Sequence, residues 1–273
     1  MTIAGHSASV SLRVSVIIPC YNAAGTVGRA LASVQAQTLT EWEAIVIDDA
    51  STDDSIAQLA PILAADPRIR LIRLAQNTGA GAARNAGLVQ AQGRFVAFLD
   101  ADDFWHPEKL ALQTRWMAAE DLALSATAYR RVNMTTGAVT EFGLPERIGY
   151  HDLLKTNVMG FSTVIYDRNA LGPRQMPLLR QRQDFAFLLM LLRELPAAGG
   201  LNRVLCTYAL GHQSLSSAKG RAIRQTWRMY RGFVGLGRAP ALWYFSQYAG
   251  RAILRHKAPA LARTLGILRA PDG

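Results

Sequence analysis

The sequence predicts an α/β protein with a mostly parallel central sheet and helices on both of its faces. Two observations carry this prediction. In the first 110 residues, short apolar and β-branched runs alternate with segments of helical periodicity, which is the order of a parallel sheet with crossover helices. Each of three runs is followed by a polar cluster, and in such sheets ligands bind beyond the carboxyl ends of the strands.

The elements of this first part follow from local patterns. The run VSVII is stopped by Pro19, AIVI leads into Asp48-Asp49, and FVAFL leads into Asp100, so each is typical of a buried strand. The segment 24–37 places apolar residues at helical spacing, and Ser51–Asp54 can cap the next helix. The expected strands are 14–18, 44–47, 69–74 and 95–99, and the expected helices are 24–37, 52–65 and 79–90.

The pattern is looser beyond Pro107 and indicates an α+β second lobe, followed by a helical, basic C-terminal extension. We expect three divisions: 12–110, 111–218 and 219–273. Strands are expected at 122–132, 162–166 and 204–208, and helices at 183–195, 221–233, 241–257 and 260–268.

Composition excludes several classes of protein. Of 273 residues, 50% are hydrophobic and 18% are charged, which rules out a disordered chain or a collagen-like repeat. Cys20 and Cys206 are the two cysteines, too few for a disulfide scaffold, so a reducing cytoplasm is expected. Neither a signal peptide nor an apolar run of membrane-spanning length is expected.

The net charge of +10 is concentrated in one segment. From Lys219 onward there are eleven basic residues and one acidic residue, so the C-terminal extension carries the whole excess and the rest of the chain is neutral. This distribution argues against nucleic acid as a partner. The extension also contains aromatic residues, and cations mixed with aromatic residues suit an anionic membrane surface, although a helical subdomain with a solvated basic face fits as well. The aromatic residues are Trp227, Tyr230, Phe233, Trp243, Tyr244, Phe245 and Tyr248.

The run Asp100-Ala101-Asp102-Asp103 predicts a metal site. Two carboxylates two residues apart at a strand end can point into one cleft, and oxygen ligands suit Mg²⁺ or Mn²⁺. The alternative is a turn that caps the helix beginning near Pro107. A second acidic pair, Asp48-Asp49, follows a neighbouring strand and favours the metal. The pair itself can accept hydrogen bonds from a base or ribose, or cap the helix after Thr52.

A glycine-rich helix start at 79–85 resembles a phosphate-binding turn, but it has neither the Lys-Ser/Thr of a P-loop nor the glycine spacing of a dinucleotide site. Arg84 lies inside this helix. Its guanidinium can reach a phosphate or pair with a carboxylate, and the residues alone leave both open.

Four motifs occur in order: VSVIIPCYN (14–22), EAIVIDDASTD (43–53), NTGAGAARNAG (77–87) and GRFVAFLDADDFW (93–105). Together they resemble the serial motifs of family 2 glycosyltransferases. The resemblance implies the GT-A fold, in which a nucleotide-sugar-binding half (12–110) is fused to an acceptor-binding and catalytic half (111–218).

The resemblance also implies roles. Asp49 matches the aspartate that binds the base, Asp100 would contact the ribose, and Asp102 would ligate Mn²⁺ or Mg²⁺ at the diphosphate, with His212 as a second candidate ligand. The metal's task would be to neutralise charge on the leaving diphosphate. The implied nucleotide-binding residues are Pro19, Tyr21, Asn22, Asp49, Arg84, Asp100 and Ala101.

Gln183-Asp184 opens an apolar helix and matches the family motif whose aspartate is the general base. Without the resemblance, a first-turn or N-cap aspartate is the simpler interpretation. His212 lies in a polar segment that could close over the diphosphate or simply link the lobes. The candidates for the acceptor or diphosphate side are Trp105, Gln183, Ser214 and Lys219.

These features predict an inverting, metal-dependent transfer of one sugar from a nucleotide donor to a glycan or lipid-linked acceptor. We expect the donor to be a UDP-sugar and the pathway to be cell-surface polysaccharide biosynthesis. The segment QTWRM (225–229) departs from the Gln-x-x-Arg-Trp motif of processive members, which favours addition of a single sugar. The expected location is the cytoplasm, with peripheral attachment to the inner face of the membrane. A nucleotidyltransferase and a catalytically silent sugar- or membrane-binding module are the alternatives; the former should carry a glycine-rich loop with Arg and Lys where this chain has 20–23, CYNA.

Overall fold

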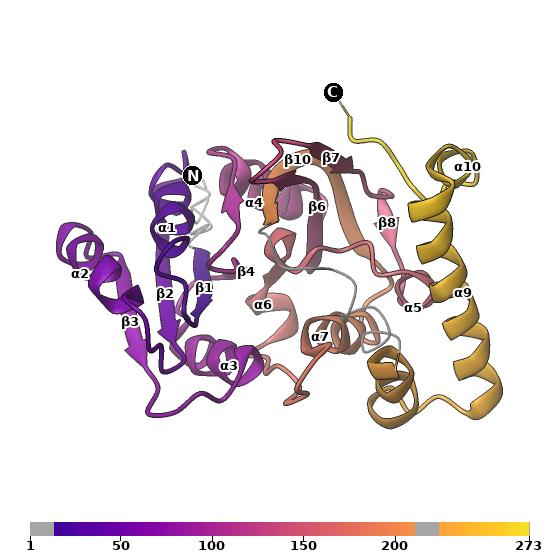
Figure 1. The fold of residues 1–273 in the computed structure, drawn as a ribbon, viewed down its shortest axis with the longest axis horizontal. Coiled ribbons are helices and arrows are strands. Elements are labelled where there is room, and N and C mark those ends of the chain that lie inside the picture. Colours follow the sequence, from indigo (N-terminus) through magenta and orange to yellow (C-terminus); the bar gives the residue numbers. More distant parts are fainter. Residues whose placement is uncertain (1–13, 211–223, 273) are drawn as a thin grey trace, which may run out of the picture.

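A computed structural model describes residues 14–210 and 224–272 of the chain. Its described strands form one ten-stranded mixed sheet whose main path runs β3-β2-β1-β4-β9-β6-β10-β5. Helices α1–α3 lie with β1–β4 at one side of the molecule, and the C-terminal helices α9 and α10 stand at the opposite side (Figure 1). The mixed α/β architecture predicted from the sequence is therefore confirmed.

The first part of the sheet is parallel. It consists of β1 (Val14–Cys20), β2 (Trp42–Asp48), β3 (Ile69–Arg73) and β4 (Phe95–Phe98), paired in the order 3-2-1-4. These four strands were all expected: β1, β2 and β4 from continuous apolar runs, which are typical of strands buried on both faces, and β3 from apolar residues that alternate with arginine, as in a less buried strand.

Helices cover both faces of this parallel part. Alternate residues of β1 enter two different cores: Ile17 packs in the core that includes α3 (Ala80–Gln90), and Ile18 packs in the core that includes α1 (Val27–Gln35). The remaining helix of this part, α2 (Ser55–Ala65), follows β2 in the chain, as predicted. Side chains on both faces of these strands are thus buried. Because this packing holds the strands in place, it also fixes the positions of their ends.

The second half of the chain extends the same sheet. β9 (Ile165–Asp167) pairs antiparallel with β4, β6 (Leu124–Asn133) pairs antiparallel with β9, and β10 (Ala198–Leu210) pairs parallel with β6. The start of the expected strand 162–166 is instead a 3-10 turn, η1 (Phe161–Thr163). The remaining elements are β5 (Phe104–Trp105), α4 (Lys109–Ala119), β7 (Val139–Phe142), β8 (Arg147–Ile148), α5 (Tyr150–Lys155), α6 (Arg168–Leu171) and α7 (Gln183–Leu192).

The C-terminal extension is helical where the structure describes it. Residues 224–228 lead into the π-helical turn η2 (Met229–Phe233), and α9 (Arg238–Lys257) and α10 (Pro259–Thr264) follow. Most of its aromatic residues face the protein and not solvent; the Tyr248 ring, for example, stacks on Phe185 with centroids 6.0 Å apart. The extension is therefore packed on the second half of the chain.

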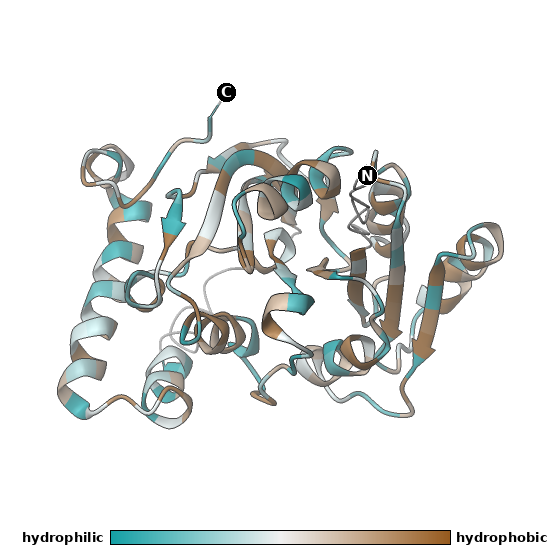
Figure 2. Cartoon of the chain, turned by 180° about the vertical axis from the view of Figure 1, so that it is seen from behind, coloured by the Kyte–Doolittle hydropathy of each residue, from teal (hydrophilic) through white to brown (hydrophobic). Residues whose placement is uncertain are grey.

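One face of α9 remains open to solvent. Leu242, Trp243 and Ile253 are 61%, 59% and 56% exposed; Leu242 and Ile253, eleven residues apart, lie on the same side of the helix, and Trp243 adjoins Leu242 at the edge of that side. The helix as a whole mixes hydrophilic and hydrophobic residues (Figure 2). Among the described residues, no helix is both long enough and apolar enough to cross a bilayer.

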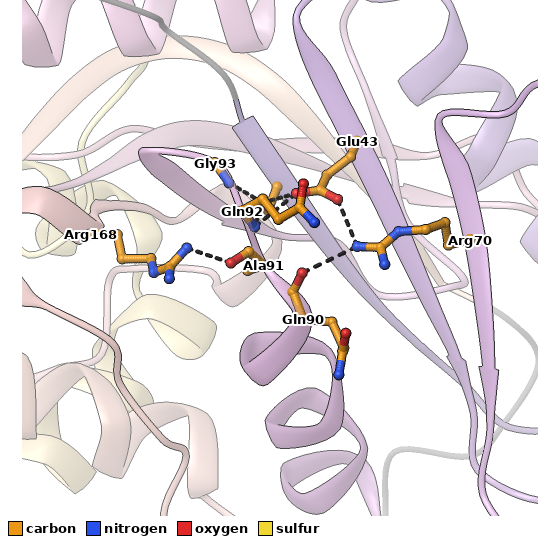
Figure 3. A network of polar contacts seen from close by, with 8 residues as sticks. Glu43, Arg70, Gln90, Ala91, Gln92, Gly93 and Arg168 are labelled. Atoms are coloured by element: carbon orange, nitrogen blue, oxygen red, sulfur yellow. Dashed lines mark hydrogen bonds and ion pairs between the residues drawn. The ribbon is translucent and has the colours of Figure 1, made fainter.

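A buried polar network joins β1, β2, β3 and the end of α3 (Figure 3). Its centre is Glu43, which is 3% exposed and accepts hydrogen bonds from Ser15 Oγ (2.7 Å), Arg70 Nη2 (2.8 Å) and the Gln92 amide (2.9 Å). Arg70 also donates to the Gln90 carbonyl, so the carboxylate ties three strands to the turn that leads into β4.

Glu43→Gln is expected to lower the free energy of unfolding by about 2 kcal/mol, because it removes a buried charge that three donors depend on. Urea denaturation measures the change. Glu120→Gln, an exposed position after α4, is the matched control and should leave the midpoint unchanged. Equal midpoints for the two variants would show that the network does not contribute to stability.

Candidate active site

Three parallel strands end at the same edge of the sheet and bring the predicted site residues together. Cys20 is in register with Asp48, and Ile17 with Phe98, so the loops after β1, β2 and β4 adjoin. They border a cavity of about 770 Å³, called here the first cavity. Its lining includes ten of the predicted residues: Pro19, Tyr21, Asn22, Asp49, Arg84, Asp100, Ala101, Asp102, Gln183 and Asp184.

Asp49 organises the start of α3. Its carboxylate accepts from the Thr78 amide (2.7 Å), the Thr78 hydroxyl (3.0 Å) and the Gly79 amide (2.8 Å). The capping that the sequence left open thus serves α3 and not the helix after Thr52. Tyr21, by contrast, is 50% exposed at the cavity wall, where its ring is free to stack on a planar group.

The loop after β1 is fixed by the loop after β2. Asn22, which has a positive φ of 49°, accepts from the Thr52 amide (2.8 Å) and donates its own amide to Ser51 Oγ (3.0 Å). A left-handed asparagine is tolerated because its short side chain bonds locally. This contact gives Asn22 a structural role beside its place in the cavity wall.

Arg84 forms an ion pair with Asp100. Of the two partners that the sequence left open, a phosphate or a carboxylate, the carboxylate is thus confirmed. The guanidinium side chain is 5% exposed and lies 4.8 Å from the centroid of the Phe161 ring. Its Nε and Nη1 atoms are buried, and within the described residues they have no hydrogen-bond partner. Buried donors without partners are costly, so an anion in the cavity would supply contacts that the described chain does not.

The loop from Asp100 to Trp105 is held from behind by Ser162. The Ser162 hydroxyl donates to Asp103 Oδ2 (2.6 Å) and accepts from the Asp100 amide (3.2 Å), and the Trp105 indole donates to the Ser162 carbonyl (2.7 Å). Burial and the charge of Asp100 raise the pKa of Asp103 to about 8. The alternative of a helix cap does not hold, because α4 begins after Glu108 without a side-chain cap.

The carboxylates present fit a divalent cation. Asp102 opens toward the cavity beside Asp100, and withdrawal from bulk water together with the Asp100 charge raises the Asp102 pKa. A nearby cation would offset that repulsion. The described residues contain no group of three or more His, Cys, Asp or Glu side chains arranged to hold a metal by themselves. This donor set suits an ion such as Mg²⁺, which is commonly held by one or two carboxylates together with substrate phosphates.

Asp184 stands in the first turn of α7. The residue just before this helix, Arg182, has a left-handed backbone conformation (φ 64°). Within the described part of the chain, its carboxylate has no hydrogen-bond partner, and α7 has no side-chain cap. Asp184 is therefore not the N-cap, but the first-turn position, where the helix dipole favours a carboxylate, is confirmed. The residue also lines a second cavity of about 1250 Å³, which shares Asp100, Arg182 and Asp184 with the first.

Trp105 lies behind the first cavity and not in its wall. It is 4% exposed and packs under the buried Lys109 amine, 4.4 Å from the ring centroid. His212, Ser214 and Lys219 lie outside the described residues, so their predicted roles stay predictions.

Several lining residues were not singled out from the sequence. The run Arg180-Gln181-Arg182 borders the first cavity next to Asp184, and Gln225 reaches it from the C-terminal extension. Arg180 and Arg182, shortly before the candidate base in the sequence, could have indicated an anionic ligand, whereas nothing in the sequence around Gln225 indicates its position. Cys20 also lines this cavity, and burial raises the pKa of its thiol to about 11, which keeps it protonated at neutral pH.

A parallel four-stranded sheet extended by a mixed second half, with carboxylates gathered at the ends of the parallel strands, defines a glycosyltransferase of the GT-A type. The chain belongs to glycosyl transferase family 2, whose family model matches residues 15–175. The family and the enzyme class predicted from the serial motifs are thereby confirmed.

Two relatives show how far the similarity extends. The chain is 41% identical over 241 residues to the putative teichuronic acid biosynthesis glycosyltransferase TuaG of Bacillus subtilis, covering 88% of this chain and 96% of that protein. It is 32% identical over 243 residues to the UDP-Glc:alpha-D-GlcNAc-diphosphoundecaprenol beta-1,3-glucosyltransferase WfgD of Escherichia coli, covering 89% and 94%.

Solved structures share the fold at low identity. S. aureus TarS 1–349 in complex with UDP-GlcNAc superposes with a TM-score of 0.67 at 22% identity, covering 88% of this chain and 72% of that one. The mannosyltransferase PcManGT of Pyrobaculum calidifontis, in complex with GDP-Man and Mn²⁺, gives 0.66 at 20% identity, covering 93% and 79%.

Proposed function

We propose that this glycosyltransferase transfers one sugar from a UDP-sugar to a hydroxyl of a glycan or lipid-linked acceptor, with inversion at the anomeric carbon, during cell-surface polysaccharide biosynthesis. The observation that carries the proposal is the position of Asp184 at the junction of two cavities, one of which gathers the expected nucleotide-binding residues. The names of TuaG and WfgD support the pathway and the lipid-linked acceptor.

The two cavities support a single displacement. A donor in the first cavity would present its anomeric carbon near Asp184, and an acceptor hydroxyl would arrive from the second. The carboxylate has no competing partner among the described residues, so it is free to take the hydroxyl proton as the new bond forms. Attack from the side opposite to the leaving diphosphate inverts the anomeric centre.

The walls of the first cavity suit the parts of a nucleoside diphosphate. The exposed Tyr21 ring offers a stacking surface for the base, and the unpartnered Nε and Nη1 atoms of Arg84 offer donors for phosphate oxygens. Asp102, with Asp100 beside it, would hold Mn²⁺ or Mg²⁺. When bound, such an ion neutralises charge on the diphosphate as it leaves.

A panel of nucleotides tests the donor class. UDP with Mn²⁺ should raise the midpoint of thermal unfolding, since about 100 Kd of a ligand stabilises the folded state by about 2.7 kcal/mol, whereas GDP and CDP should not. UDP-sugars should then lose UDP in the presence of an alkyl glycoside acceptor. Stabilisation by GDP alone would contradict the choice of uracil.

Assays of binding and turnover with the same nucleotides distinguish the proposed function from its two alternatives. A nucleotidyltransferase would release pyrophosphate from UTP and a sugar 1-phosphate, and a silent binding module would bind UDP without turnover. The loop after β1 argues against the first alternative, because its Cys20-Tyr21-Asn22-Ala23 lacks the cations such an enzyme needs there.

For location, we propose the cytoplasm with peripheral attachment to an anionic membrane through the open face of α9. The packing of the other aromatic residues leaves Trp243 as the exposed aromatic residue of this helix. Leu242 and Ile253 share its apolar face, and the exposed Arg238 and Lys257 stand at the two ends of the helix. Such a face can lie in the lipid headgroup region while the cations meet anionic lipids.

Trp243→Ser with Ile253→Ser is expected to weaken sedimentation with phosphatidylglycerol-containing vesicles by about tenfold, because burial of these two side chains is worth more than 1 kcal/mol. Val89→Ser, a substitution of a 69% exposed valine on α3, is the matched control. Unchanged sedimentation of the double variant would remove the membrane proposal and leave the transfer reaction untouched.

A further inference from the structure

The second cavity is the larger of the two, and the C-terminal extension builds one of its walls. Tyr248, Ala252 and Arg255 enter it from α9, Arg263 enters from α10, and residues 268–271 complete the rim. The opposite wall comes from β6, β7 and η1.

Specific contacts fix this wall in place. Gly143, after β7, forms a β-bridge with Arg269, and Asn202 in β10 donates to the Ala270 carbonyl (3.0 Å) and to Asp272 (2.7 Å). A Cβ at Gly143 would lie 2.4 Å from the Ala270 carbonyl oxygen, so the close approach requires glycine. The cavity is therefore a formed feature of the fold.

Cations dominate the second cavity beyond the mouth that it shares with the first. Four arginines line it there, Arg131, Arg255, Arg263 and Arg269, against a single carboxylate, Glu141. Within the described part of the chain, none of the four arginines forms an ion pair. We call these four residues the arginine cluster.

Two members of the cluster, Arg131 and Arg255, have defined surroundings in the cavity wall. The Arg131 guanidinium lies 4.7 Å from the centroid of the Phe142 ring and 5.7 Å from that of Tyr129, which fixes its plane. Burial lowers the pKa of Arg255, and the charges of Arg131 and Arg251 act in the same direction. Arg255 is partly buried, whereas Arg131, Arg263 and Arg269 are exposed, so the cluster presents its charge to a ligand that enters the cavity.

The charge balance indicates which anion would fit. Four guanidiniums against one carboxylate leave an excess of three positive charges, which suits a diphosphate ester better than the single charge of a uronate. Arginine forks match phosphate oxygens in two-point contacts. The rings of Tyr129, Phe142 and Tyr248 in the same walls offer apolar faces for a sugar.

We propose that the arginine cluster binds the diphosphate of an acceptor glycan whose reducing end is a diphosphate ester, and so orients its terminal hydroxyl toward Asp184. This inference rests on the proposed function and specifies its acceptor site. Arg131 and Arg255 are the residues that select an acceptor with a diphosphate over a neutral one.

Direct binding in the presence of saturating UDP and Mn²⁺ tests the proposal, because UDP then blocks the first cavity. The probes are N-acetylglucosamine linked through diphosphate to an octyl chain, the neutral octyl glycoside of N-acetylglucosamine, and octyl glucuronide. The wild type is expected to bind the diphosphate probe at least tenfold more tightly than either of the others. Arg131→Gln with Arg255→Gln should remove that preference and leave the Kd for UDP unchanged.

Arg224→Gln with Arg228→Gln is the matched control, since it removes two exposed arginines of the same extension that do not line the cavity. Equal affinities of the wild type for the diphosphate and neutral probes, tighter binding of the glucuronide, or an equal loss in the control pair would each overturn the proposal. Arg255→Gln alone carries the test if the double variant unfolds. Absence of UDP binding counts against the proposed function, whereas the ratio between probes decides the role of the cluster.

Discussion

Asp184→Asn is expected to reduce kcat by about 10³-fold while the Kd for UDP stays within twofold of the wild type. A positioned general base contributes about 10²- to 10⁴-fold, and asparagine keeps the shape of the side chain but cannot take a proton. The position of Asp184 between the two cavities makes the loss specific to the chemical step. Single-turnover transfer from a UDP-sugar, measured beside calorimetric titration of UDP, separates the two quantities.

Asp152→Asn serves as the matched control for this variant. Its side chain is 65% exposed, lies in the first turn of α5 and contacts Lys155 at 3.6 Å, so neutralising it should change neither quantity. If Asp184→Asn retained wild-type turnover, the base would have to be another group and the single-displacement account would fail.

Asp102→Asn is expected to abolish the dependence of UDP binding on Mn²⁺ and to lower transfer by about 10²-fold or more. The substitution removes the carboxylate that opens into the first cavity beside Asp100, and with it the charge that would hold a cation at the diphosphate. Titration of UDP with and without Mn²⁺ measures the effect directly, since the difference between the two affinities should vanish in the variant.

The control for Asp102→Asn is Asp121→Asn. Asp121 is exposed and has a positive φ of 50°, a conformation that asparagine adopts readily, so this exchange should be silent. UDP binding that needs no metal in the wild type and is unaffected by Asp102→Asn would contradict the metal assignment.

The first half of the fold was open to prediction from sequence because its signals are local. The runs that became β1, β2 and β4 are apolar on both faces and end in polar loops, so both the strands and their common edge could be derived from the chain. Asp49, Asp100 and Asp102 were placed at that edge for the same reason, and all three line the first cavity.

The second half depends on contacts that no local pattern encodes. The insertion of β9 between β4 and β6 and the parallel pairing of β10 with β6 are results of long-range pairing, through which the second half of the chain continues the same sheet. The aromatic residues of the extension were expected to suit a membrane, yet Tyr230, which is fully buried, packs beside Phe185. Aromatic side chains serve a core and an interface equally well, and only the fold decides between them.

The bridge between Gly143 and Arg269 has a practical consequence for work on shortened proteins. Removing residues 239–273 would delete the proposed membrane-binding face of α9 and, at the same time, one wall of the second cavity with Arg255. Loss of turnover after such a deletion therefore cannot be taken as a measure of how much the enzyme needs a lipid surface, and point substitutions on the outer side of α9 are the sound comparison.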